Sequence, residues 1–204
     1  MEKKTLTNIL IVEGAASKWN QDVFGHDDKT ISHWTLPYAL KFFAGKLRGW
    51  REILSGFLWG GTWAIKQYFK KAKPEDNQLI IAKSKGCVRV FEWLKRNPEY
   101  FKLKTGKTAI LFVDGHSKIK REIFSRLPPY GKRRHFDRAD IFGSYRNNVR
   151  IFNVYQHNKW PHGAYFLGAD CQVKIKDKDV DHFSIIKTPT VQHYLQAACE
   201  WLDK

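Results

Sequence analysis

The sequence has 204 residues, and its 36 Lys and Arg against 20 Asp and Glu give a formal net charge of +16. A hydrophobic content of 43% and an aromatic content of 15% exclude a disordered chain and suffice for a single folded domain over residues 1–204. The three cysteines, Cys87, Cys171 and Cys199, are too few and too scattered for a disulfide framework, which favours a reducing compartment.

Asn8 to Val12, with Ile-Leu-Ile-Val after the asparagine, predicts a fully buried strand of a parallel sheet. The run breaks at Glu13-Gly14, too early for a signal peptide, and no later run approaches the length of a transmembrane helix. We therefore expect a cytoplasmic protein. Residues 17–32 show no regular period and are expected to form a loop.

Residues 34–73 are rich in aromatic side chains and are punctuated by glycines. Short helices are expected over residues 36–47, 50–58 and 62–71. Aromatic side chains belong to a core more often than to a binding surface. Even so, this density of tryptophan beside glycine pairs also suits an apolar cover over a substrate, or a patch that docks on a membrane interface.

The stretch from Leu79 to Lys95 joins a strand to a helix with almost no loop between them. Leu79 to Ile81 is a short apolar run, and helical spacing of apolar residues begins at Gly86. Ser84 lies on the tight turn, so its hydroxyl is expected at the edge of the sheet and at a helix N-terminus, which favours negative charge. This is the geometry of a nucleophile elbow. The structural alternative is an ordinary small-residue turn.

The remainder of the chain alternates strands and helices without an internal repeat, which predicts an α/β protein with a mostly parallel sheet flanked by helices. Asp114 directly follows one of these strands, and His182 lies between the last strand and the last helix. Strands are expected at 108–113, 149–156 and within 164–175, and helices at 119–127 and 190–202.

The turn Ala82-Lys83-Ser84-Lys85-Gly86 resembles the Gly-x-Ser-x-Gly elbow of the α/β-hydrolases, of the lipase and esterase kind. Small residues two before and two after the serine are required there because strand and helix nearly touch. The resemblance implies a small α/β-hydrolase-like fold, a helical cap or lid within residues 34–73, and chemistry without a metal or cofactor.

The resemblance also implies an oxyanion hole made by two backbone N–H groups. One comes from Lys85, which follows the serine. The other comes from the loop after the first strand, where Glu13-Gly14-Ala15 stands in place of the family's frequent His-Gly-x sequence, so Ala15 or Ala16 is the expected donor.

A serine nucleophile needs a general base, and the base needs a carboxylate that fixes its tautomer. In α/β-hydrolases the order is serine, acid, histidine, which fits Ser84, Asp114 and His182. Most of the family takes the acid from one strand later, but there this chain reads Tyr155-Gln156-His157-Asn158, without a carboxylate. Some lipases use the earlier strand, as Asp114 would. Asp170 and Asp181 remain alternative acids.

The order of these three residues favours a serine ester hydrolase that works through an acyl-enzyme. Lys83 and Lys85 flank the serine and predict an anionic or phosphate-bearing substrate. Lys83, Trp59 and Trp160 are the candidate substrate-binding residues, and the expected substrate is a small or lipid-like ester.

Two other readings of the sequence remain open. The first is a basic module that binds nucleic acid or another polyanion through Lys132–Arg134, Arg146 and Arg150, although no nucleic-acid-binding motif is present. The second is a hydrolase fold whose catalysis has decayed. The basic face also suits an anionic surface or polymer, and no specific protein partner is implied.

Overall fold

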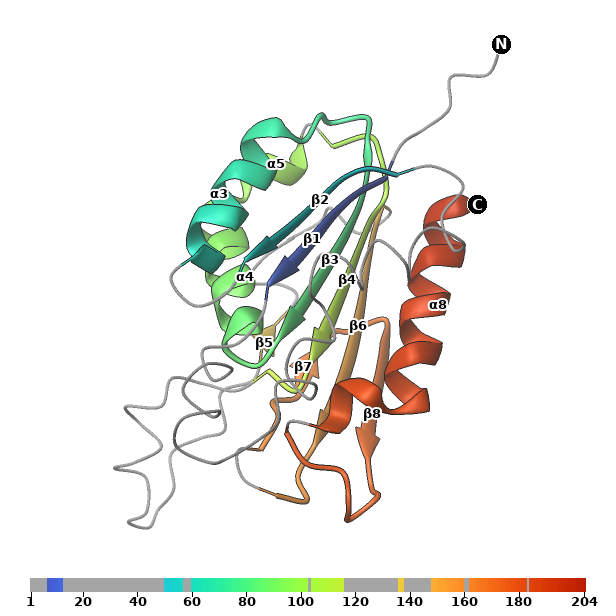
Figure 1. Cartoon of the computed structure of the whole chain (residues 1–204). Coiled ribbons are helices and arrows are strands. Elements are labelled where there is room, and N and C mark those ends of the chain that lie inside the picture. Colours follow the sequence, from blue (N-terminus) through green and yellow to red (C-terminus); the bar gives the residue numbers. More distant parts are fainter. Residues whose placement is uncertain are drawn as a thin grey trace.

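A six-stranded sheet forms the centre of the molecule, with strand order β2-β1-β3-β4-β6-β8. The computed structural model describes residues 7–12, 50–56, 60–102, 104–115, 136–137, 148–159, 162–182 and 184–204. Every neighbouring pair in this sheet is parallel, so the α/β class and the parallel sheet are confirmed (Figure 1). The strands are β1 (Thr7–Val12), β2 (Trp50–Gly56), β3 (Asn77–Lys83), β4 (Thr108–Val113), β6 (Val149–Gln156) and β8 (Cys171–Ile175).

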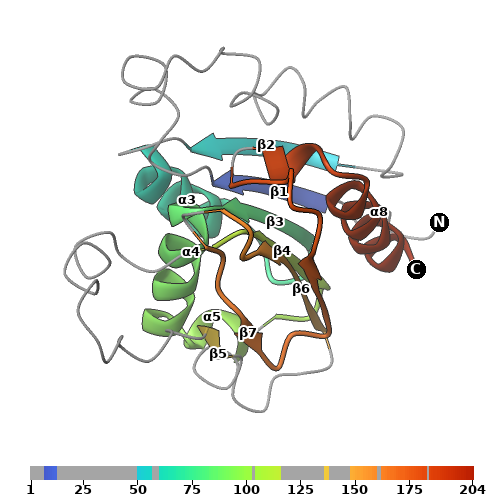
Figure 2. The same cartoon turned by 90° about the horizontal axis from the view of Figure 1, so that it is seen from below.

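Helices cover both faces of the sheet. On one face lie α3 (Gly60–Lys71), α4 (Lys85–Arg96) and the short α5 (Glu99–Lys102). On the other lie the 3-10 turn η2 (Ser184–Lys187) and the C-terminal helix α8 (Pro189–Asp203), as Figure 2 shows. A further short parallel pair joins β5 (Phe136–Asp137) to β7 (Phe166–Leu167).

Each face of the sheet has its own hydrophobic core, because successive residues of a strand point to opposite faces. In β1, Ile9 and Ile11 pack in the cluster that contains Leu195 of α8. Leu10 and Val12 pack in the cluster that contains residues of α3 and α4. All six residues of β1 are buried, which explains why this strand reads as a continuous apolar run.

The expected elements at Asn8–Val12, 62–71, 79–81, 108–113, 149–156 and 190–202 are confirmed as β1, α3, β3, β4, β6 and α8. The helix expected over residues 50–58 is wrong, because residues 50–56 form β2, which pairs with β1. The apolar residues of this stretch recur at helical spacing, but pairing with the edge of β1 overrides that local pattern.

The cap expected within residues 34–73 is also wrong for its second half. Residues 50–56 belong to the central sheet, and α3 buries Ile65, Tyr68 and Phe69 against that sheet. Tyr68 and Phe69 are therefore core. Residues 34–49 and the helix expected at 119–127 lie outside the described residues.

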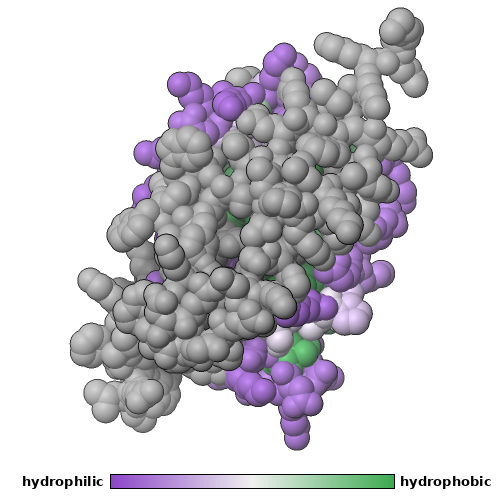
Figure 3. All heavy atoms as spheres, viewed as in Figure 1, coloured by the Kyte–Doolittle hydropathy of each residue, from purple (hydrophilic) through white to green (hydrophobic). Residues whose placement is uncertain are grey.

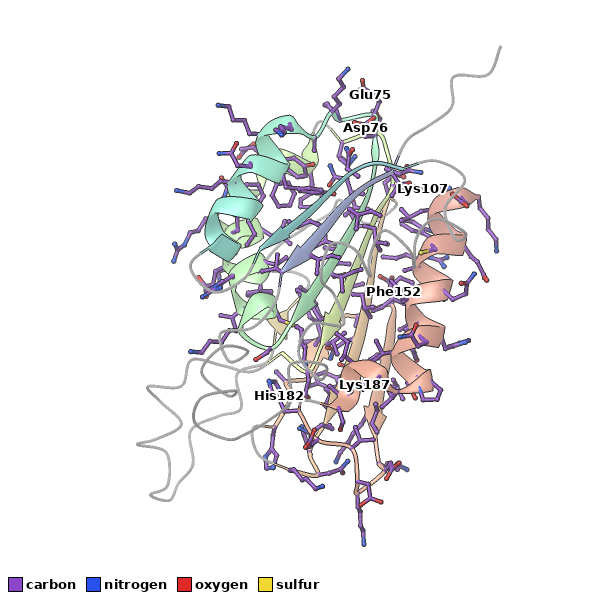
Figure 4. All side chains as sticks on the ribbon, in the orientation of Figure 1. Glu75, Asp76, Lys107, Phe152, His182 and Lys187 are labelled. Carbon is purple, nitrogen blue, oxygen red and sulfur yellow. The ribbon has the colours of Figure 1, made fainter. Side chains whose placement is uncertain are left out.

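The sheet has a topological switch point beside β1. The chain places β2 on one side of β1 and then places β3 on the other. Ligand sites of open parallel sheets form at the carboxyl ends of the strands near such a point, and β3 is the strand that ends just before Ser84. His182 lies toward this end of the molecule, whereas Glu75, Asp76 and Lys107 lie at the opposite end (Figure 4).

At that opposite end, the turn before β3 packs closely on the segment before β4. The N–H groups of Thr105 and Gly106 both donate to the carbonyl of Pro74. The ammonium of Lys104 donates to the carbonyls of Pro74 and Asp76, and its burial lowers its pKa to about 8. Gly106 has no space for a side chain, because a Cβ there would lie 2.3 Å from the carbonyl oxygen of Asp76.

Gly106→Ala should therefore lower the free energy of unfolding by about 1–3 kcal/mol, since the backbone of the turn must move to relieve the clash. Urea denaturation measures the effect. Thr105→Ala is the matched control, because Thr105 is exposed and should tolerate the change. Equal stability of Gly106→Ala and the unmutated protein would contradict the close approach.

Candidate active site

Ser84 lies between β3 and α4 with no intervening loop, as the sequence predicts. It is the N-cap of α4 and has φ 56° and ψ −125°, a backbone conformation that residues with side chains rarely adopt. Its N–H donates to the carbonyl of Val113 in β4 at 3.0 Å, which helps to hold the turn. Strained backbone of this kind concentrates at functional sites.

The small residues around Ser84 have the packing role that the motif predicts. Ala82 is fully buried in β3, and Gly86 is buried in the first turn of α4. The thiol of Cys87 donates to the carbonyls of Ala82 at 3.0 Å and Val113 at 3.6 Å. Burial raises the pKa of the Cys87 thiol, so this group stays protonated and supports the turn, and does not compete as a nucleophile.

Three buried side chains form a continuous hydrogen-bonded chain. His182 Nε2 lies 2.8 Å from Ser84 Oγ, and His182 Nδ1 lies 2.6 Å from Asp114 Oδ2. Because an ionised carboxylate only accepts hydrogen bonds, Nδ1 carries the proton and Nε2 accepts from the serine hydroxyl. The structure thus brings together the three residues that the sequence singles out, although they lie far apart along the chain.

Asp114 directly follows β4 and is fully buried. Its backbone also has positive φ, at 49°, and its N–H donates to the carbonyl of Val154 in β6 at 2.7 Å. Its Oδ1 accepts from the backbone N–H of Gln156 at 3.0 Å, and its Oδ2 accepts from the Gln156 side-chain amide at 3.1 Å. These bonds offset the loss of water around a buried charge.

Gly163 packs directly against the carboxylate of Asp114. A Cβ at this position would lie 2.0 Å from Asp114 Oδ1 and 2.7 Å from Tyr155 Cβ. The N–H of Gly163 donates to the carbonyl of Gln156 at 2.9 Å, and His157 Nε2 donates to the Gly163 carbonyl at 2.9 Å. The backbone of this loop therefore lies directly against the acid.

The two alternative acids are engaged elsewhere. Asp170 Oδ2 accepts from the N–H of Ile151 at 2.7 Å. Asp181 Oδ1 accepts from the N–H and the hydroxyl of Ser184, at 2.7 and 2.8 Å, and so stabilises the turn that leads from His182 into η2. The geometry selects Asp114.

Lys83 and Lys85 flank the serine as expected, at the end of β3 and the start of α4, and both are half-buried. Lys85 is the first residue of the helix, and the first N–H groups of a helix point out of its end. Ala15, Trp59 and Trp160 lie outside the described residues.

Two residues at the site are missed by sequence reasoning. In the sequence, the stretch around Gln156 is notable only because it lacks a carboxylate. In the structure, Gln156 makes two hydrogen bonds to Asp114. Gly163 reads as an ordinary loop glycine. A glutamine at the end of a strand that is expected to be buried is a usable signal for the first, because a buried amide needs partners.

No family model and no curated protein matches this sequence. Among the described residues, no three His, Cys, Asp or Glu side chains form a metal-ligand set. In the same part of the chain, no helix is long and apolar enough to cross a membrane. The surface visible in Figure 3 is mostly hydrophilic where it is described. Among the described residues, Tyr165 and Leu167 are the large apolar side chains that are exposed.

Gly163→Ala should displace the Asp114 carboxylate and weaken its bond to His182, because the new methyl group would occupy the place of Oδ1. The nitrogen chemical shifts of His182 measure this, and they should move from a single Nδ1–H tautomer toward a mixture. Gly106→Ala is the matched control, with the same chemical change and a clash at the far end of the sheet. An unchanged His182 spectrum in Gly163→Ala would contradict the arrangement.

Proposed function

We propose that the protein is a serine hydrolase of the α/β-hydrolase type that cleaves esters through an acyl-enzyme. The observation that carries the proposal is the buried chain from hydroxyl to imidazole to carboxylate, with 2.8 Å between Ser84 Oγ and His182 Nε2 and 2.6 Å between His182 Nδ1 and Asp114 Oδ2. Both distances are within hydrogen-bond range, as a nucleophile, its base and an orienting acid require.

In the proposed reaction, Ser84 Oγ attacks the ester carbonyl carbon while His182 Nε2 takes the hydroxyl proton. The tetrahedral intermediate collapses, the bond to the alcohol oxygen breaks, and His182 protonates the departing alcohol. Water then attacks the acyl-enzyme with His182 again as base, which releases the acid and restores Ser84. Asp114 remains ionised throughout and stabilises the imidazolium.

The developing oxyanion would be held by the backbone N–H of Lys85 and by that of Ala15. The place of Lys85 at the N-terminus of α4 supports its part, because the helix dipole favours negative charge there. Ala15 is proposed on the sequence resemblance alone.

The order of the strands supports the proposed hydrolase type. The serine follows β3, the acid follows the adjacent strand β4, and the histidine follows β8 at the edge of the sheet. This is the order serine, acid, histidine of the α/β-hydrolases, with the acid on the earlier of the two strands that the family uses.

For the substrate we propose an ester that carries an anionic or phosphate group, bound beside Lys83 and Lys85. Lys83 and Lys85 adjoin Ser84 in the chain, and two positive charges near the site would raise the local potential and favour anions. Trp59 and Trp160 are proposed to contact the apolar part of a lipid-like substrate.

The first test is labelling by a fluorophosphonate probe and hydrolysis of p-nitrophenyl esters. Ser84→Ala should abolish the labelling, and Asp114→Asn should lower kcat by about 10³–10⁴-fold, because the neutral amide no longer fixes the Nδ1–H tautomer. Thr105→Ala, which removes an exposed hydroxyl near the opposite end of the sheet, is the control. Labelling that persists in Ser84→Ala would remove this residue from the nucleophile role.

The second test concerns the two lysines. The double variant Lys83→Gln and Lys85→Gln should raise KM for an anionic ester about tenfold or more, and should leave KM for a neutral ester of the same acyl length within about twofold, because only the anion loses an attractive charge. Lys70→Gln is the control, since Lys70 is exposed on α3. Equal changes for the two esters would refute the proposed preference.

A second candidate function is binding of a polyanion. The guanidinium of Arg150 lies 5.3 Å from the Trp201 ring centroid, and Lys107 Nζ lies 5.8 Å from it, which gathers two cations and an aromatic ring, a combination that suits nucleic acid. Salt-sensitive DNA binding without any esterase activity would favour this function. If the unmutated protein neither hydrolyses the esters nor reacts with the probe, a decayed hydrolase is favoured.

A further inference from the structure

Gln156 is the last residue of β6, and its side chain is fully buried beside the carboxylate of Asp114. The backbone N–H of Gln156 donates to Asp114 Oδ1, and Gln156 Nε2 donates to Asp114 Oδ2. One residue thus binds both oxygens of the acid. The oxygen that accepts from the side-chain amide is the same oxygen that accepts from His182.

The turn after β6 fixes the orientation of the Gln156 amide. Its Oε1 accepts from the N–H of Asn158 at 2.7 Å and of Lys159 at 3.0 Å. Its Nε2 has a second acceptor in the Lys159 carbonyl at 3.0 Å. If the amide were turned over, Oε1 would face the carboxylate and the NH₂ group would face two donors, so the hydrogen-bond network allows one orientation only.

The same turn also reaches the loop that carries the histidine. Asn158 Nδ2 donates to the carbonyl of Ile175 at 3.3 Å and to that of Val180 at 3.4 Å. Val180 precedes His182 by two residues. The turn from Gln156 to Lys159 is therefore bonded to the acid on one side and to the histidine loop on the other.

We propose that Gln156 is the positioning residue of the site, which holds the Asp114 carboxylate at the angle where Oδ2 meets His182 Nδ1. This inference rests on the proposed hydrolase function. A glutamine suits the place and a glutamate does not, because the amide donates to the carboxylate, whereas a second carboxylate would oppose it at about the same distance. Gln156 itself does not touch the reacting atoms and acts through Asp114.

The test compares Gln156→Met and Gln156→Glu with the unmutated protein. Gln156→Met removes the amide without adding charge, and it should lower kcat about ten- to a hundredfold, the size found for residues that orient a functional group through hydrogen bonds, with KM within about twofold. Gln156→Glu should lower kcat further, because it places a second carboxylate beside the first. Gln196→Glu is the matched control, since Gln196 bonds Glu200 at an exposed place on α8.

A second readout, the nitrogen chemical shifts of His182, does not depend on catalysis. The unmutated protein should show one Nδ1–H tautomer and Gln156→Met a mixture, provided that circular dichroism shows both to be folded. Reduced kcat with unchanged KM and a mixed tautomer would support the proposal. Normal kcat in Gln156→Met, or a single tautomer in the folded variant, would overturn it and leave the hydrolase proposal intact.

If the unmutated protein neither hydrolyses esters nor reacts with the probe, the hydrolase function fails, and the tautomer comparison alone decides whether Gln156 positions the acid. If Gln156→Met does not fold, Gln156→Leu is used for the same comparison, because it also removes the amide without adding charge.

Discussion

The hydrogen bond between the buried carboxylate of Asp114 and His182 is the constraint on which the rest of the site depends. A fully buried charge is tolerated only where protein groups replace the water that it loses. Here Gln156 supplies two donors and His182 supplies a third. The end of β4, the end of β6 and the loop after β8 must therefore meet within a few ångströms, and the sheet must align them.

The parallel sheet aligns these segments through backbone hydrogen bonds that continue beyond the ends of its strands. The N–H of Ser84 bonds the carbonyl of Val113, and the N–H of Asp114 bonds the carbonyl of Val154. Each residue thus leaves its own strand with positive φ while it remains bonded to the next strand. The two strained turns follow adjacent strands, so Ser84 and Asp114 lie at the same end of the sheet, where His182 bonds both.

Close backbone contacts occur at both ends of the sheet, but they involve different groups. At the amino end, the segment around Gly106 packs on the turn before β3, and Lys104 satisfies backbone carbonyls there. At the carboxyl end, a comparable close approach at Gly163 brings backbone against the acid itself. A glycine is required at both places for the same steric reason, but only at Gly163 would an added methyl group meet the Asp114 carboxylate.

The sequence by itself determined most of the sheet, because buried parallel strands read as continuous apolar runs. It also pointed to Ser84 and His182 and favoured Asp114 among three candidate acids, since a small-residue turn, an aspartate after a strand and a histidine before the last helix are local features. It did not reveal that residues 50–56 form an edge strand, because the apolar residues of the 50–58 stretch recur at helical spacing and the strand rests on pairing with β1.

Only the tertiary structure decided which carboxylate meets His182 and what holds it. The sequence favoured Asp114 but left Asp170 and Asp181 open, and in the structure these two have partners in other loops. The contributions of Gln156 and Gly163 depend on contacts between segments separated by about 40–50 residues from Asp114. A local pattern cannot encode such contacts, because the position of one loop against another follows from the packing of the whole sheet.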